Sequence, residues 1–82
     1  MMICACCGRK KKLLDAFYSV GEGASKIDLC SDCRDIARRL ELDVLGGEKE
    51  LYDIHRYQLQ KRAKAQTDAF QMWQRELDEK IG

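Results

Sequence analysis

Two cysteine pairs, Cys4-Ala5-Cys6-Cys7 and Cys30-Ser31-Asp32-Cys33, decide the fold of this 82-residue chain. Each pair has the C-x-x-C spacing, which lets two thiolates from one tight turn reach a single metal ion. Two such pairs supply four sulfur ligands, the complete tetrahedral shell that is typical of structural zinc. The sequence therefore predicts one structural Zn²⁺ per chain, with four ligands: Cys4, Cys7, Cys30 and Cys33.

The five cysteines could instead form disulfides, and three of them compete for the first two ligand positions. The odd count, the paired spacing and the lack of a signal-peptide apolar segment after Met1 favour thiolates in a reducing compartment. Gly8 favours Cys7 over Cys6 as the second ligand, because a knuckle needs a positive φ just after that ligand and glycine adopts it freely. Cys6 is then expected to be a small buried side chain, with a reactive thiol as the alternative.

The composition describes a small chain without proline, in which charges of both signs are nearly balanced. A core of this size rarely supplies more than about 3–5 kcal/mol, so we expect a metal ion as a staple. Fifteen Lys and Arg against fourteen Asp and Glu leave a formal charge of +1, which argues against a general affinity for nucleic acid. No apolar run approaches the about 20 residues of a membrane span, so we expect a cytoplasmic protein without membrane contact.

The segment between the two pairs has the pattern of a β-hairpin. Leu13 to Val20 and residues 26–29 alternate as strands, and the glycine-containing residues 21–25 have turn chemistry. After Cys33 the apolar period becomes helical, with Ser31 as the expected N-cap and Gly46-Gly47 as the stop signal. The stripe of this expected helix consists of Ile36, Ala37, Leu40 and Val44.

The order of knuckle, hairpin and ligand-bearing helix is the treble-clef arrangement, and it resembles the N-terminal zinc-binding domain of the ClpX unfoldases. The resemblance covers residues 3–45 and depends on Cys4-Ala5-Cys6-Cys7-Gly8-Arg9 and Leu29-Cys30-Ser31-Asp32-Cys33. It implies a small zinc module that dimerises and docks other proteins, and the ATPase activity is not carried over. A rubredoxin-like iron site is the alternative, although such sites use two glycine-backed knuckles and Arg34 follows Cys33 here.

Residues 48–81 are helix formers without proline or internal glycine, which predicts one long amphipathic C-terminal helix. Its apolar positions recur at a mean step of 3.5, the coiled-coil value, although Ala63 and Gln66 weaken the seam. At 1.5 Å per residue the helix would be about 50 Å long, more than the front module can cover. We therefore expect residues 1–46 to form the zinc module and residues 47–82 a partner-binding segment, with a helix that splits and folds back as the alternative. The candidate partner-binding residues are Tyr52, Leu59, Phe70, Trp73 and Leu77.

Two groups of basic residues are the candidates for contacts with nucleic acid. They are Arg9, Lys10, Lys11 and Lys12 in the front half, and Lys61, Arg62 and Lys64 in the second half. Either group could line phosphates. A solvated surface is the simpler interpretation, and the first group would also offset the −2 charge of a zinc ion with four thiolates.

The expected fold class is a small metal-bound α+β protein, a treble-clef module followed by a long helix. A four-cysteine zinc site has no open coordination position, and the sequence contains neither H-E-x-x-H nor a phosphate-binding glycine loop, so an enzyme is not expected. We expect a protein–protein interaction module, a regulatory accessory factor of bacterial or phage-like kind that binds a larger protein machine or its own copy as a homodimer. No small-molecule substrate is expected, and a nucleic-acid-binding zinc finger is the alternative.

Overall fold

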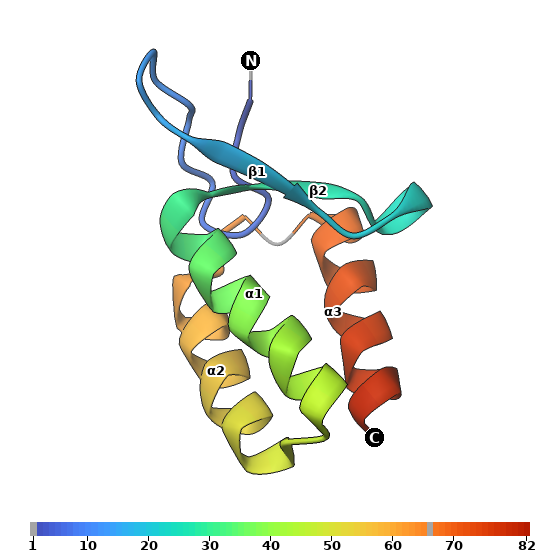
Figure 1. Cartoon of the computed structure of the whole chain (residues 1–82). Helices are drawn as coiled ribbons and strands as arrows, with labels where there is room; N and C mark the ends of the chain where they lie inside the picture. Colours follow the sequence, from blue (N-terminus) through green and yellow to red (C-terminus); the bar gives the residue numbers. More distant parts are fainter. Residues whose placement is uncertain (1, 66) are drawn as a thin grey trace.

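A knuckle and a two-stranded antiparallel hairpin form the front of the molecule (Figure 1). The computed structural model describes residues 2–65 and 67–82, so Met1 and Gln66, the latter an expected seam position, lie outside the described residues. Strand β1 spans Phe17–Val20, the 3₁₀ turn η1 spans Gly23–Ser25 and strand β2 spans Ile27–Cys30. Phe17 pairs with Cys30 and Val20 with Ile27, which confirms a hairpin over these residues.

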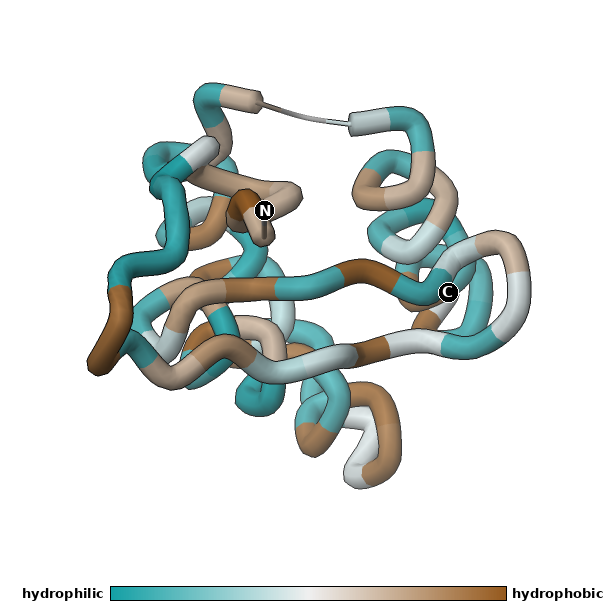
Figure 2. Tube along the Cα trace, turned by 90° about the horizontal axis from the view of Figure 1, so that it is seen from above, coloured by the Kyte–Doolittle hydropathy of each residue, from teal (hydrophilic) through white to brown (hydrophobic). Residues whose placement is uncertain are grey.

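The first strand is shorter than its alternation predicts. Leu13 and Leu14 lie in a turn and are 93% and 95% exposed, so the prediction of a strand from Leu13 is wrong. Asp15 is the physical reason, because its carboxylate accepts the backbone N–H of Lys12 at 2.8 Å and the guanidinium of Arg9 at 2.7 Å. These two bonds close residues 9–15 into a loop. Figure 2 shows the hydrophobic apex of this loop at the edge of the molecule, after a hydrophilic run.

Helix α1, Ser31–Gly46, continues directly from β2. The prediction that Ser31 is the N-cap is wrong: Cys30 holds that position with extended φ and ψ, and no side chain caps this end. Cys30 is the last residue of β2, so the helix starts one residue earlier than a serine cap would place it. The predicted stop is confirmed, since Gly47 adopts the left-handed conformation at φ 67° and its N–H bonds to the carbonyls of Asp43 and Val44.

Two helices occupy the segment that the sequence predicts to be one. Helix α2 spans Lys49–Arg62 and helix α3 spans Asp68–Ile81. The carbonyl of Cys6 accepts the N–H groups of both Lys64 and Ala65 at 2.9 Å, so the knuckle, not a further turn of α2, satisfies these backbone groups. The single long helix is therefore wrong, and the fold-back alternative describes the chain.

The three helices lie side by side beneath the hairpin (Figure 1), and one core joins them to it. Because this core takes residues from both 1–46 and 47–82, the two segments fold together. The longest extent of the molecule is 37 Å, well below the about 50 Å of a continuous 34-residue helix. Its largest fully buried side chains include Leu29, Leu40, Leu59 and Phe70.

The turn of the hairpin, at the end away from the knuckle, contacts α3. The hydroxyl of Ser25 donates to the carboxylate of Glu76 at 3.1 Å, and Ser25 is itself buried. Gly21 has φ 81°, and a Cβ there would lie 2.5 Å from the carbonyl oxygen of Ser25 and 3.1 Å from the ring of Trp73. Only glycine fits this position, because both the conformation and the space exclude a side chain.

Candidate metal centre

Four sulfur atoms gather where the knuckle meets the start of α1. The Sγ atoms of Cys4, Cys7, Cys30 and Cys33 all lie within 4.8 Å of one another, and all five cysteines of the chain are free thiols. A tetrahedral ion with metal–sulfur bonds of about 2.3 Å requires sulfur–sulfur separations of about 3.8 Å. The Sγ atoms of Cys7 and Cys30 are 3.8 Å apart. The four residues therefore fit one metal ion.

Backbone hydrogen bonds position the first pair of ligands. Gly8 has φ 78°, as the sequence analysis predicts, and its N–H bonds to the carbonyl of Cys4 at 3.0 Å. The N–H of Cys4 bonds to the carbonyl of Arg9 at 2.9 Å, and the N–H of Ala5 bonds to the carbonyl of Asp28 in β2 at 2.9 Å. The last of these contacts fixes the knuckle against the strand that carries Cys30.

The second pair is positioned by regular secondary structure. Cys30 is the last residue of β2, and Cys33 lies in the first turn of α1. A helix N-terminus carries a partial positive charge, which stabilises a thiolate such as that of Cys33. The two pairs therefore differ: one is a glycine-backed knuckle, and the other is a strand-to-helix junction.

Burial and neighbouring thiols raise the pKa of two of these cysteines, Cys4 and Cys33, in the absence of a cation. The hydrogen bond with Cys33, followed by burial, raises the pKa of Cys4 to about 12. For Cys33 the contact with Cys4 lowers the pKa, but contact with Cys6 and burial outweigh it and raise the pKa to about 12. A divalent ion reverses this balance, because it binds thiolates and displaces their protons. The site would then carry a charge of −2.

Cys6 lies beside this cluster but faces a different partner. Its side chain is fully buried, and its Sγ donates to the carbonyl of Leu59 in α2 at 3.7 Å. The four-sulfur cluster does not include it. The expectation of a small buried side chain is confirmed. Its backbone carbonyl, which receives Lys64 and Ala65, has a larger structural effect than its thiol, because it ends α2.

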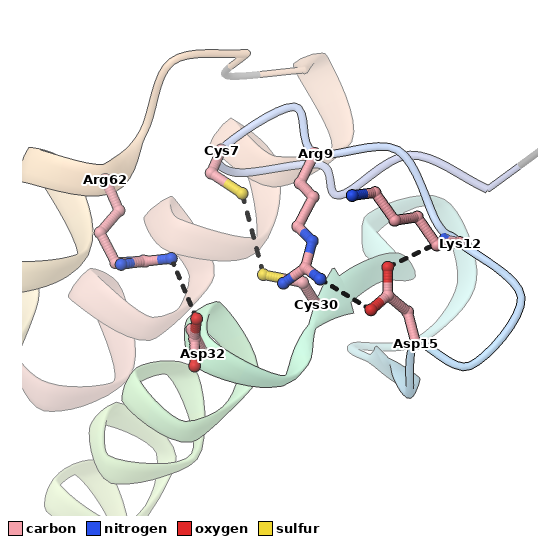
Figure 3. Close-up of polar contacts among 7 residues, drawn as sticks. All are labelled: Cys7, Arg9, Lys12, Asp15, Cys30, Asp32 and Arg62. Carbon is pink, nitrogen blue, oxygen red and sulfur yellow. Dashed lines mark hydrogen bonds and ion pairs between the residues drawn. The ribbon is translucent and has the colours of Figure 1, made fainter.

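Arg62 is a residue of the site that sequence reasoning treats only as a basic residue. Its Nε donates to the Sγ of Cys33 at 3.4 Å, and its terminal nitrogen lies 3.7 Å from the carboxylate of Asp32 (Figure 3). The bond to Cys33 is the largest cause of the raised pKa of Arg62. A donor that bonds to a ligand atom in this way orients that ligand and offsets its charge when a metal is bound. Only the fold-back of α2 brings Arg62 here, so no local signal in the sequence indicates the contact.

The basic residues lie on two sides of the cysteine cluster. Figure 3 shows Arg62 on one side of Cys7, and Arg9 and Lys12 on the other. Arg9 is paired with Asp15 at 2.7 Å. Three basic side chains, those of Lys61, Arg62 and Lys64, line a hollow of about 220 Å³ together with Cys7. Within the described residues, no carboxylate pairs with Lys10, Lys11 or Lys12.

The residues expected at a partner surface belong to the core instead. Each is at most 5% exposed, and the rings of Phe70 and Trp73 lie 5.9 Å apart within that core. The 3.5-residue period therefore reflects two separate helices that pack against α1 and the hairpin, not an exposed seam. These five side chains are therefore not available at the surface. The five residues are Tyr52, Leu59, Phe70, Trp73 and Leu77.

A partly buried polar network joins α2 to α3. The hydroxyl of Tyr52 donates to Asp78 at 2.6 Å and accepts from Gln74 at 3.1 Å, and Arg56 binds both oxygens of Asp78 at 2.9 Å. Burial, then the contact with Asp78, raises the pKa of Tyr52. Burial alone would raise the pKa of Asp78, but the bonds from Arg56 and Tyr52 outweigh it and lower that pKa.

The single histidine, His55, has a structural contact. The Nδ1 atom of His55 lies 2.6 Å from the carboxylate of Asp43, which is buried near the end of α1. This contact ties α2 to α1 across the turn at Gly47. His55 is not part of the four-cysteine cluster.

Comparisons of this chain with protein-family models, with curated proteins and with solved structures find no match. The function must therefore be inferred from the geometry of the site and the surface.

Proposed function

We propose that the four-cysteine cluster binds zinc and that the ion has a structural role. Four sulfur donors from the chain itself complete a tetrahedral shell, which leaves no position at which water or substrate could be activated. The strand-to-helix setting of Cys33 supports zinc over a rubredoxin-like iron, since only the first pair has a glycine-backed turn. Metal analysis of protein purified under reducing conditions should give one zinc per chain, whereas stoichiometric iron would contradict this assignment.

On this zinc-stapled scaffold we place a non-enzymatic protein–protein interaction function. The observation that carries it is the exposure of five large apolar side chains on α1 and α2, which are between 46% and 84% exposed. We call these residues the outer apolar face: Leu42, Leu45, Leu51, Ile54 and Tyr57. The resemblance to the ClpX zinc-binding domain, which implies docking of other proteins, agrees with this function.

The pattern on α2 shows that this exposure is organised. Leu51, Ile54 and Tyr57 follow one another at three-residue steps, which places them on one side of the helix. Tyr52 and Leu59 point to the opposite side and are buried. An 82-residue chain whose core already uses Phe70, Trp73 and Leu77 does not need a second apolar surface for its own stability. Clustered exposed apolar side chains mark interaction sites.

Site-specific photo-crosslinking tests this function directly. A photoreactive amino acid at Ile54 should crosslink one defined protein in cells of the native host, and Leu51→Ser should abolish the crosslink. The same probe at Arg75, on the exposed side of α3, is the matched control. A crosslink to a second copy of the chain would show that the partner is the protein itself and that the assembly is a homodimer. Equal labelling from both positions, or no crosslink at all, would contradict the proposal.

A nucleic-acid function has weaker support. Of the seven candidate cations, Arg9 is paired with Asp15 and Arg62 is bonded to Cys33, so neither is free for a phosphate. If DNA binding nevertheless occurs, the logarithm of its binding constant should fall with the logarithm of salt concentration by about 0.9 for each phosphate neutralised. Loss of that binding in Lys61→Gln and Lys64→Gln variants would favour nucleic acid over a protein partner.

A further inference from the structure

We propose that the loop of residues 9–15, the basic loop, contacts the surface of an anionic phospholipid membrane. In this arrangement Leu13 and Leu14 enter the boundary between headgroups and acyl chains, while Lys10, Lys11 and Lys12 contact the headgroups. The proposal concerns a surface separate from the outer apolar face and does not rest on the protein–protein function proposed above.

The exposure of the two leucines is the first observation. Leu13 and Leu14 are the most exposed large apolar side chains among the described residues. They are adjacent in the chain, and they form the apex of a loop that projects from the body beyond β1 (Figures 1 and 2). Two nearly fully hydrated leucines at one apex have no role in the core, because nothing in the fold covers them. Such an apex is free to enter an apolar phase.

The loop is preorganised, and this is the second observation. Ile3 and Lys10 form an antiparallel bridge, and the N–H of Lys11 bonds to the carbonyl of Met2 at 2.9 Å. At the other end, Asp15 accepts from Arg9 and from the backbone of Lys12, and its own N–H bonds to the carbonyl of Lys12 at 3.1 Å. Hydrogen bonds therefore fix the turn that carries the two leucines before any membrane is bound. Binding does not require the loop to become ordered, which avoids an entropic cost.

The charge distribution is the third observation. The basic loop contains four cations and one acid, Asp15, which forms an ion pair with Arg9. The loop thus has a charge of +3, whereas the rest of the chain sums to −2. The excess positive charge lies next to the exposed leucines. Anionic lipid surfaces attract clustered lysines through their negative potential.

The arrangement of apolar and basic side chains in the loop favours an anionic membrane over a nucleic acid. The phosphate backbone of a nucleic acid would use the lysines, but it offers nothing to Leu13 and Leu14. In a bilayer, by contrast, hydrocarbon lies beneath a layer of phosphates, so an apolar apex followed by cations meets both layers in turn. No helix in residues 2–65 and 67–82 has the length and apolar character needed to cross a bilayer. The contact that we propose is a peripheral one, made by the loop alone. The expectation of no membrane contact considered only spanning segments.

Vesicle co-sedimentation of the zinc-loaded full chain tests the proposal. The probes are vesicles of phosphatidylcholine alone and of phosphatidylcholine mixed with phosphatidylglycerol. Wild type should bind the anionic vesicles and not the neutral ones. The double variant Leu13→Ser/Leu14→Ser should lose at least about tenfold in affinity, and replacing the three lysines by glutamine should reduce affinity about fivefold per lysine.

The controls separate membrane insertion from other effects. Leu45→Ser changes an exposed leucine outside the basic loop and should bind as wild type does. Since Leu13 and Leu14 make no core contact, their variants should retain the circular dichroism and zinc content of wild type. No binding to anionic vesicles would overturn the proposal. So would vesicle binding that needs the lysines but not the leucines, because it would indicate electrostatic adsorption to the headgroups without insertion of Leu13 and Leu14. Binding that Leu45→Ser weakens equally would overturn it too.

Discussion

At the scale of single residues, the neighbours Cys6 and Cys7 have different roles: Cys7 is a candidate metal ligand, and Cys6 is a packing residue. Cys7 belongs to the four-cysteine cluster and is partly accessible, whereas Cys6 is buried and its Sγ donates a hydrogen bond to the carbonyl of Leu59 in α2. Gly8 makes this division possible, because its positive φ turns the chain so that the thiol before it faces the other three ligands. One residue of register therefore separates a metal ligand from a packing residue.

The serine variants of these two cysteines should consequently behave differently. Cys7→Ser removes one of four ligands, and we expect it to abolish tight zinc binding and to unfold the chain. Cys6→Ser should keep one zinc per chain, with only the weak Sγ bond and some packing lost. Metal analysis with circular dichroism of both proteins provides the measurement. Zinc retained by Cys7→Ser and lost by Cys6→Ser would show that the ligand assignment is wrong.

Substitutions of Arg62 test whether its hydrogen bond to Cys33 strengthens metal binding. Its Nε bond to Cys33 supplies positive charge beside the thiolates, so Arg62→Ala should weaken zinc binding about 10- to 100-fold. Arg62→Lys should recover part of this loss, because it restores the charge without the planar donor geometry. Competition with a chromophoric chelator measures the affinity. Equal affinities for wild type and Arg62→Ala would show that the contact has no influence on the metal.

The buried hydroxyl of Tyr52 gives the chain a distinctive response to alkaline pH. Its folded pKa is raised above the unfolded value of about 10, so the stability that it contributes is fully present below that pH. That contribution is lost as the pH rises through the folded pKa. Tyr52→Phe should cost about 1–2 kcal/mol at neutral pH, because Gln74 and Asp78 lose a partner. Urea denaturation should show that the difference in unfolding free energy between wild type and Tyr52→Phe becomes smaller above about pH 10. A difference that becomes larger there would contradict the role given to the Tyr52 hydroxyl.

At the scale of elements, the connection between α2 and α3 decides the architecture. The knuckle carbonyl of Cys6 draws Lys64 and Ala65 out of helical geometry, and Thr67 starts the next helix with its side chain. Neither end is marked by proline or glycine. A metal-binding turn near residue 6 therefore sets the end of a helix near residue 62.

The cap at Thr67 can be tested with a matched pair of substitutions. Its hydroxyl accepts the N–H of Phe70 at 3.2 Å, so Thr67→Ala should destabilise the protein by about 1 kcal/mol. Thr67→Ser keeps the acceptor and should stay close to wild type. Thermal or urea denaturation of the two variants provides the comparison. Equal losses in both would show that the cap bond does not support α3.

Sequence reasoning succeeds for these elements where the determinants are local. The cysteine spacing, Gly8, the hairpin turn and the Gly47 stop all act within a few residues, and each is found as predicted. It fails for residues 48–81 because the decisive partner, the carbonyl of Cys6, lies more than fifty residues away. It fails for Leu13 although Asp15 is a local partner, because apolar alternation does not indicate that the Asp15 carboxylate closes a turn there. The periodicity of Phe70, Trp73 and Leu77 identifies apolar faces correctly, but it does not indicate that these faces pack inside the chain.

At the scale of the whole molecule, the metal cluster and the helices belong to one structural unit. Cys4 and Cys33 are members of the same core as Leu59, Phe70 and Trp73. Loss of the ion should therefore affect α3, although none of its residues is a ligand. We infer that one metal ion at the front of the chain maintains a core that extends to its last helix.

Trp73 permits the most direct measurement, because it is the only tryptophan and is buried in α3. The zinc-loaded protein is titrated with a chelator while metal release and tryptophan fluorescence are followed in the same sample. We predict that Trp73 becomes exposed in step with the loss of one zinc per chain, in a single transition that circular dichroism also reports. A metal-free protein that retains its helices and a buried Trp73 would contradict the claim.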